Sequence, residues 1–438
     1  VGKTTVLRTF VEGIRQIEKD HEFLLLAPTG KASVIMRRKI GLEARTIHDL
    51  LNRYKWINRQ NWTLLQEGGR KIGGIKTVII DEASMLDVEL MATLFRALNW
   101  NEVERLVLVG DANQLPPIGP GKPFVDILDY IRKDQDRMRK HLAELTFNCR
   151  QSQGSQTVKL AAHYSKSSEQ PCEEVLWLLD EKRSTGDLVI RFWENEEELL
   201  ALIEASLLEA AMDVAEARGI ESEEQNLGVT EIFDLVHSLD DLGSSKDLEA
   251  IQLITPYRYD VSGVNSVNLF MQRLLRGDRT IRRYSTHGFV WKDKVLQVRN
   301  FNYWAWDHEQ KKSVRNDDTY VPNGAIGYVF PRRASNGKIQ VKFPRDFVRY
   351  SYYLTGKQSE TNLELGYALS VHKSQGSQFT NTIFILPAKE SDFLSRELLY
   401  TALTRNQRKL YLLLERNSSL LKDRLWTGHS EILRRNSA

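Results

Sequence analysis

A short apolar run, Thr77–Ile80, ends on two adjacent carboxylates, Asp81 and Glu82. Four β-favouring residues in a row predict a buried strand, because a strand that is covered on both faces is apolar throughout. In open α/β sheets, ligands bind beyond the carboxyl ends of the strands. The carboxylate pair therefore predicts a metal or phosphate site, and the alternative is a strand that simply runs out into solvent.

Two further segments show the same order of strand and polar residues. An apolar stretch within Phe23–Ser33 leads into a Pro-Thr-Gly turn, and a strand within Glu104–Pro117 ends at Gly110 and Asp111, with Gln114 close behind. The intervening stretches have helical periodicity over residues 31–40, 87–98 and 124–132. Alternating strands and helices predict a parallel, doubly wound α/β sheet.

The second half of the chain repeats this alternation with a second set of strands. They are predicted over residues 142–147, 251–255, 382–386 and 409–414. Between residues 293 and 354, short β-rich runs are separated by Asn-Gly pairs, a pattern typical of antiparallel hairpins. We expect a small antiparallel barrel there, inserted into a second parallel sheet.

Charge is segregated along the chain. Of its 58 acidic and 61 basic residues, 23 acidic but only 5 basic residues lie in the segment 169–250. Within that segment a long helix is predicted over Glu196–Ala217. Its apolar stripe is typical of core packing and comprises Leu199, Ile203, Leu207, Ala210 and Val214. The basic remainder of the chain favours a polyanionic partner, whereas the acidic segment is expected to be a solvated helical insertion.

Cysteine usage and hydropathy exclude several classes of protein. Cys149 and Cys172 are too few for a disulfide framework or a zinc ribbon, and they indicate a reducing, cytoplasmic environment. No apolar run approaches the roughly 20 residues that a membrane helix needs. The sequence therefore predicts no membrane partner.

The first residues suggest a phosphate-binding loop. Gly2, Lys3, Thr4 and Thr5, followed by an amphipathic run to about Ile17, match the second half of the pattern G-x-x-x-x-G-K-[ST]. In such a loop the lysine reaches the β- and γ-phosphates and the following hydroxyl holds Mg²⁺. Because the chain has no initiator Met, we expect it to be truncated at its N-terminus within this loop.

These pieces combine into one site for ATP and Mg²⁺. Asp81 is expected to hold the metal through its water shell, Glu82 to activate the attacking water, and Gln114 to sense the γ-phosphate. Phosphoryl transfer also needs positive charge on the transition state. Arg150 and Arg405, which follow elements of the second sheet, are the predicted sources of that charge.

Eight motifs resemble those of the RecD-like branch of superfamily 1 helicases, and together they cover nearly the whole chain. LGYALSVHKSQGSQF at 365–379 and LLYTALTRNQRKLYLL at 398–413 resemble motifs V and VI. In the same order as in the family, GKTT resembles motif I, APTGKAS motif Ia, ARTIHDLL motif Ib, IIDEASML motif II, VGDANQLPP motif III and TFNCRQ motif IV.

The resemblance implies two RecA-like P-loop motor domains and an ATP-dependent DNA helicase that moves 5′ to 3′. It implies nucleotide contacts from Gly2, Lys3, Thr4, Thr5, Asp81, Glu82, Gln114, Arg150, Gly376 and Arg405. It implies contacts to a nucleic-acid backbone from Thr29, Lys31, Thr46, His48, His372, Lys373 and Ser374. Hydroxyls, amides and cations of this kind hold phosphates without reading sequence.

By the same resemblance we predict the domain organisation. The first motor domain is residues 1–140, with 50–75 as a pin that splits duplex; the second is 141–290 and 356–438, with the acidic helical insertion at 169–250. Residues 291–355 correspond to an SH3-like accessory domain. There Tyr303, Trp304 and Trp306 are expected either to stack on bases or to form the small domain's own core.

Two other functions remain open at this point. One is a fragment or degenerate relative that binds single strands without hydrolysing ATP, and the other is an ATPase directed to RNA, since backbone contacts are shared by both nucleic acids. The partners implied are single-stranded DNA and duplex junctions, together with a fused N-terminal domain or other recombination and repair proteins.

Overall fold

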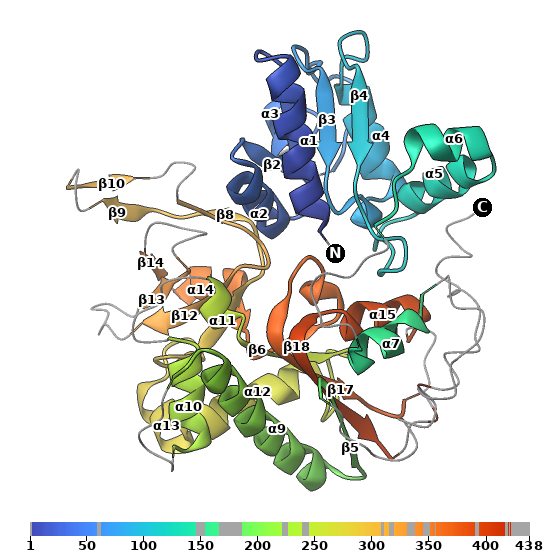
Figure 1. Ribbon diagram of the computed structural model, residues 1–438. Coiled ribbons are helices and arrows are strands. Elements are labelled where there is room, and N and C mark those ends of the chain that lie inside the picture. Colours follow the sequence, from blue (N-terminus) through green and yellow to red (C-terminus); the bar gives the residue numbers. More distant parts are fainter. Residues whose placement is uncertain are drawn as a thin grey trace. The chain divides into compact units, whose positions relative to one another are not determined.

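The computed structural model describes most of the chain in two compact units, one made chiefly of residues 1–152 and the other of 153–427 (Figure 1). The residues described are 2–58, 63–145, 154–165, 186–220, 227–238, 245–307, 311–314, 319–330, 338–344, 351–354, 356–389, 394–416, 419 and 421.

The first unit is built on a four-stranded parallel sheet of order β2-β1-β3-β4. Its strands are β1 (Phe23–Ala27), β2 (Ala44–Thr46), β3 (Thr77–Ile80) and β4 (Arg105–Leu108). In register, Leu26 lies beside Ile80, and Ile80 lies beside Leu108. The carboxyl ends of these strands therefore meet at one edge of the sheet.

Helices cover both faces of this sheet, because successive side chains of a buried strand point to opposite sides. Leu25 and Ile79 pack against α1 (Lys3–Ile17) and α2 (Gly30–Ile40), whereas Leu26 and Ile80 pack on the other side. The elements on that second side are α3 (Ile47–Arg53), the short 3₁₀ helix η1 (Ala83–Met85), α4 (Val88–Ala97) and α5 (Pro123–Arg132), with α6 (Gln135–His141) next to α5.

Within residues 50–75, the chain makes a small antiparallel bridge between Ile57 and Leu64. Trp56, next to this bridge, is buried in the core of the first unit, and its indole N–H donates to the Arg70 carbonyl at 2.8 Å. The base of this excursion is therefore fixed to the first unit, while residues 59–62 lie outside the described residues.

The second unit contains a five-stranded parallel sheet of order β16-β6-β17-β18-β5. Its strands are β5 (Leu188–Trp193), β6 (Ile251–Thr255), β16 (Ala368–Ser370), β17 (Phe379–Leu386) and β18 (Asn406–Glu415). Two parallel sheets flanked by helices confirm the α/β class and are consistent with two RecA-like motor domains.

The remaining helices among the described residues belong to this second unit. They are α7 (Gln156–Ala162), α9 (Glu196–Ala217), α10 (Val229–Val236), α11 (Ser245–Leu248), α12 (Val264–Arg276), α13 (Asp278–Tyr284), α14 (Gly356–Asn362), α15 (Arg396–Leu403) and the 3₁₀ turn η3 (His372–Ser374). None of the helices among the described residues is long and apolar enough to cross a lipid bilayer.

The acidic segment forms part of the second sheet's core. Helix α9 spans the predicted residues, and its whole apolar stripe is fully buried against the sheet. The same segment supplies β5, which pairs in parallel with β18 at the sheet edge. The sequence pattern did not predict β5, whose partner lies more than 200 residues further along the chain.

The strand predicted at 142–147 is wrong where the structure describes it. Helix α6 ends at His141, the Leu142 N–H closes its last turn on the Met138 carbonyl at 3.1 Å, and residues 142–145 form no strand. Leu145 is exposed, so within residues 142–145 no sheet covers this apolar side chain. Residues 146 and 147 lie outside the described residues.

An antiparallel sheet of order β14-β13-β12-β7-β15 occupies the region predicted to be a barrel. Its strands are β7 (Lys294–Gln297), β12 (Ile326–Phe330), β13 (Ile339–Lys342), β14 (Ser351–Leu354) and β15 (Leu363–Leu365). Two small pairs accompany it, β8 (Phe301–Asn302) with β11 (Tyr320–Val321), and β9 (Ala305–Asp307) with β10 (Lys312–Val314).

The aromatic residues of this region have different environments. Tyr303 is buried, and its hydroxyl donates to Gln297 Oε1 at 3.0 Å and accepts from Asn362 Nδ2 at 3.2 Å. Tyr303 is therefore part of the small sheet's core, whereas Trp304 is exposed. The side chain of Trp306 lies outside the described residues.

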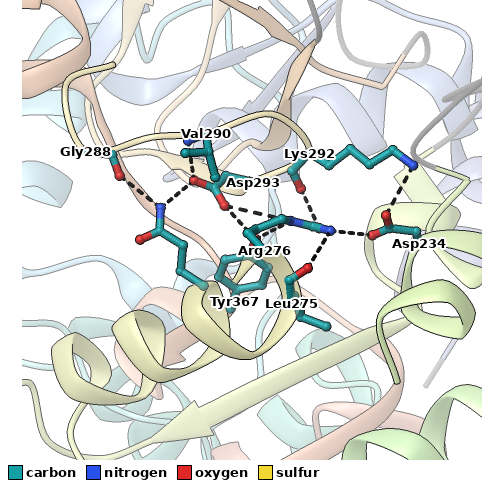
Figure 2. Close-up of polar contacts among 9 residues, drawn as sticks. Asp234, Leu275, Arg276, Gly288, Val290, Lys292, Asp293 and Tyr367 are labelled. Carbon is teal, nitrogen blue, oxygen red and sulfur yellow. Dashed lines mark hydrogen bonds and ion pairs between the residues drawn. The ribbon is translucent and has the colours of Figure 1, made fainter. Parts of the chain in front are cut away.

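A buried ionic network joins this antiparallel sheet to the helices of the second unit (Figure 2). Arg276, at the end of α12, contacts Asp234 Oδ1 on α10 at 2.9 Å and donates to the Lys292 carbonyl at 2.7 Å. Its Nε lies 3.3 Å from the Tyr367 hydroxyl and 3.9 Å from Asp293 Oδ1. The Arg276 guanidinium thus links helix α10 to the segments that lead into β7 and β16.

Asp293, immediately before β7, is fully buried in that network. It accepts hydrogen bonds from the Val290 N–H at 2.7 Å, Gln272 Nε2 at 2.6 Å and the Tyr367 hydroxyl at 2.9 Å. Burial raises the pKa of Asp293 to about 6, because it disfavours the charged form more than these donors favour it. The network therefore contains a carboxyl group that titrates near neutral pH.

Candidate nucleotide site and strand-binding edge

At the carboxyl edge of the first sheet, the start of α1 meets the end of β3. Gly2 has a left-handed φ of 89°, a conformation that glycine adopts without strain, and α1 begins at the next residue. The Lys3 Nζ lies 3.3 Å from Glu82 Oε2. Thr4 and Thr5 follow in the first turn of α1. The structure thus brings together residues that are about 80 positions apart.

Asp81 and Glu82 differ in environment although they are adjacent. Asp81 is 7% exposed, and its Oδ1 accepts the Glu82 N–H at 2.9 Å. Burial, with the neighbouring Glu82 charge, raises the pKa of Asp81, while Lys3 opposes this effect. Glu82 has a φ of 52°, a left-handed conformation that is strained for a residue with a Cβ. The backbone therefore turns sharply at this position.

The end of β4 is held tightly against the end of β3. The Ala83 N–H donates to the Val109 carbonyl at 2.8 Å. A Cβ on Gly110 would lie 2.9 Å from both the Ser84 nitrogen and the Phe124 ring, so only glycine fits there. Gly110 thus allows the loop that carries Gln114 to approach the carboxylate pair.

Gln114 is held by Asp111, a residue that the sequence analysis gave no role. The Gln114 Nε2 donates to Asp111 Oδ2 at 3.3 Å. Its Oε1 is buried and has no hydrogen-bond partner within the described part of the chain. A buried acceptor in this state suits a ligand or water that donates a hydrogen bond. The position of Asp111 in the loop that follows β4, three residues before Gln114, was the signal that it could orient Gln114.

The donors at this edge fit a phosphate with its cation. A carboxylate whose pKa is raised by burial and by a neighbouring charge gains from a divalent ion, and Lys3 supplies charge for phosphate oxygens. Among the described residues, no three His, Cys, Asp or Glu side chains gather as a metal cluster.

The expected strand contacts of the first unit lie on the neighbouring strand ends. The Thr29 hydroxyl caps α2 by accepting the Ala32 N–H at 3.2 Å, and the Thr46 hydroxyl caps α3 by accepting the Asp49 N–H at 3.1 Å. β1 and β2 are adjacent, with Ala27 beside Thr46. Each hydroxyl still has its own proton to donate. Lys31 is buried and His48 is exposed.

In the second unit, His372, Lys373 and Ser374 form η3, directly after β16. Ser374 is buried, and its hydroxyl donates to the Val371 carbonyl at 2.8 Å, so it stabilises the turn. Burial lowers the pKa of His372, which favours a neutral imidazole. Lys373 pairs with Glu364 at 2.8 Å. Glu364 belongs to β15, and no sequence motif pointed to it.

Arg405 and Gly376 are close together in the second unit. Arg405 is 4% exposed, and its Nε and Nη1 donate to the carbonyls of Thr401 and Ser377 at 2.7 and 3.1 Å. Gly376, next to Ser377, has a left-handed φ of 70°. The Arg405 guanidinium is thus fixed by backbone oxygens. Arg150 lies outside the described residues.

Comparison with protein families finds two matches. An AAA domain model matches residues 1–120, and a UvrD-like helicase C-terminal domain model matches residues 365–413. The first covers the carboxylate pair and the start of α1, and the second covers η3, Gly376 and Arg405. Both groups of site residues therefore lie inside matched segments.

Three curated relatives align with almost the whole chain. An uncharacterized protein of Methanocaldococcus jannaschii is 30% identical over 99% of this chain and 37% of its own length. The ATP-dependent RecD2 DNA helicase of Deinococcus radiodurans is 26% identical over 88% of this chain and 42% of its own. The RecBCD enzyme subunit RecD of Mycobacterium tuberculosis is 26% identical over 93% of this chain and 64% of its own. The chain thus spans about two fifths of the length of the first two.

Proposed function

Because this chain belongs to the RecD-like branch of the superfamily 1 helicases, we propose that it is the motor region of an ATP-dependent DNA helicase or translocase. ATP hydrolysis would drive movement along single-stranded DNA, in the 5′-to-3′ direction, and would separate duplex at junctions. The family is supported by the order of the eight motifs and by the RecD and RecD2 relatives.

The observation that carries the proposal is the contact between Lys3 and Glu82 at the edge that Asp81 also occupies. Lys3 would bind the β- and γ-phosphates, and Thr4 with Asp81 would hold Mg²⁺. Glu82 would orient and deprotonate the attacking water, with Gln114 next to the γ-phosphate. Bound Mg²⁺ would neutralise charge on the phosphates.

We assign the remaining roles as part of the same proposal. Arg405 and Arg150 would stabilise the transition state, and Gly376 would approach the nucleotide. Thr29, Lys31, Thr46, His48, His372 and Lys373 would hold the strand's phosphates, and Ser374 would contribute by fixing the turn that carries His372 and Lys373. Residues 291–355 would act as an SH3-like accessory domain and residues 50–75 as a pin. Recombination and repair proteins, or a fused N-terminal domain, are the proposed partners.

The test is Glu82→Gln, compared with the unsubstituted protein. This change keeps the size of the side chain but removes the base, so ATPase activity stimulated by oligo(dT) should fall about 100-fold or more. Binding of oligo(dT) should be retained, because Glu82 does not contact the strand in this proposal.

Glu89→Gln is the matched control, because Glu89 is exposed on α4 of the same unit. Its ATPase activity should equal that of the unsubstituted protein. Near-normal turnover by Glu82→Gln would contradict the role of that residue. Strand binding without ATPase activity in the unsubstituted protein would instead support a binding module.

A further inference from the structure

The loop after β6, residues 256–263, presents an aromatic side chain at the carboxyl edge of the second sheet. Tyr259 is 70% exposed. Thr255, the last residue of β6, lies beside Ser370, the last residue of β16, and its carbonyl accepts the Val371 N–H at 3.2 Å. Tyr259 and the turn η3 therefore follow neighbouring strand ends.

Hydrogen bonds hold the backbone of this loop. The Val264 and Asn265 N–H groups donate to the carbonyls of Tyr257 and Arg258 at 3.0 and 3.1 Å. A Cβ on Gly263 would lie 2.1 Å from the Tyr259 carbonyl oxygen, so the turn requires glycine. The exposed ring is thus carried on an ordered support, which lowers the entropic cost of using it as a contact.

Three cations lie around this loop, each after a different strand. Arg258 contacts Glu364 Oε1 at 2.6 Å, and Lys373 of η3 contacts the other oxygen of the same carboxylate at 2.8 Å. Lys389, which follows β17, contacts Asp260 at 2.8 Å and lies 5.5 Å from the centroid of the Tyr257 ring. The loops that follow β6, β16 and β17 thus each carry a cation, and Arg258 and Asp260, which make two of these contacts, are the sequence neighbours of the exposed Tyr259.

An exposed ring on a loop whose neighbouring loops carry cations is a combination that suits single-stranded nucleic acids. Every base has a face that stacks on an aromatic ring, and the flanking phosphates need positive charge. A purely apolar protein partner would gain little from three cations. The carboxyl edge of a parallel sheet is also the edge where ligands of such folds bind.

We propose that Tyr259 is a stacking platform for one base of the bound single strand, with Arg258, Lys373 and Lys389 holding the phosphates on either side. The contact is independent of sequence, as a translocating motor requires. This inference rests on the proposed function, since it assigns a base contact to the strand that the motor follows.

The test compares Tyr259→Ala and Tyr259→Phe in the full chain, by fluorescence anisotropy with two probes. One probe is labelled oligo(dT), and the other is an abasic oligonucleotide of the same length, which has phosphates but no bases. Tyr259→Ala should weaken oligo(dT) binding about fivefold or more and leave abasic binding unchanged. Tyr259→Phe should retain the affinity, because the ring remains.

Tyr130→Ala is the matched control, a change at a tyrosine of α5 that is 59% exposed. It should alter neither affinity. Unchanged oligo(dT) binding by Tyr259→Ala, or an equal loss on both probes, would overturn the inference while leaving the motor proposal standing. If the unsubstituted chain binds neither probe, the motor proposal itself is contradicted, and the inference falls with it.

Discussion

Glu82 occupies a left-handed backbone conformation although it is not glycine. Such a conformation costs about 1–3 kcal/mol and persists only where the surroundings impose it. Here the Ala83 N–H is fixed by Val109, and the Glu82 N–H by the Asp81 side chain. The backbone turn therefore separates two adjacent carboxylates into one buried group and one beside Lys3.

Asp293 provides a prediction on pH dependence. Its pKa is raised from 3.8 to about 6, so the folded state binds this proton more tightly than the unfolded chain does. The resulting stabilisation is complete below about pH 4 and is lost as the pH rises through about 6. In urea unfolding, the stability of the unsubstituted protein relative to Asp293→Asn should fall by about 1.4 kcal/mol between about pH 5 and about pH 7.5.

The Asn variant is a suitable reference because it keeps the shape of the side chain and does not titrate. Its carbonyl oxygen is able to accept from Val290 and Gln272, and its amide to donate to the Tyr367 hydroxyl. Parallel stability profiles of the two proteins across this pH range would contradict the raised pKa.

At the scale of elements, α9 is central to the second unit. It packs against β17, β18 and β5, and Leu207 in its apolar stripe is fully buried. Leu207→Ala should lower the free energy of unfolding of the second unit by about 2–5 kcal/mol, because the change leaves a cavity. Thermal or urea unfolding measures this loss.

Met212→Ala tests the same helix on its exposed side, where the side chain is 56% exposed. It should change stability by less than about 0.5 kcal/mol. If Leu207→Ala were equally mild, α9 would be a solvated addition to the unit and not part of its core.

Elements with a strong local signal could be predicted from the sequence, and elements that depend on distant partners could not. β3 is a continuous apolar run, and the apolar residues of α9 recur at helical spacing. β5 (Leu188–Trp193) also has β-favouring residues, but the acidic stretch around it masks this short signal, and its pairing with β18 places it in the sheet. The run at 142–147 has strand-like composition, but Leu145 finds no sheet to cover it.

The same limit applies to the candidate site. The contact between Lys3 and Glu82 could be expected from the sequence. The order of the motifs indicates that the start of the first helix and the ends of the strands share one edge of the sheet. The burial of Arg405 was not predictable, because two of its hydrogen-bond acceptors are backbone carbonyls, which every residue type supplies. Tyr259 was missed because its exposure depends on the turn at Gly263.

For the whole molecule, the net charge of +3 is a poor guide to polyanion binding. The segment 169–250 has 23 acidic and 5 basic residues, a net charge of −18. The rest of the chain therefore has 35 acidic and 56 basic residues, a net charge of +21. Affinity for oligo(dT), measured by anisotropy over a series of KCl concentrations, should fall with a log–log slope of about −0.7 per phosphate contacted. A flat profile would contradict binding through phosphates.

Glu364 gives the strand-binding edge a counter-anion of its own. Its two oxygens already hold Arg258 and Lys373 before any nucleic acid arrives. A phosphate that binds there would replace the Glu364 carboxylate as the partner of Arg258 and Lys373. When the phosphate leaves, the carboxylate would pair with the two cations again. Such an exchange would weaken each phosphate contact but speed its release, as the proposed movement along a strand requires.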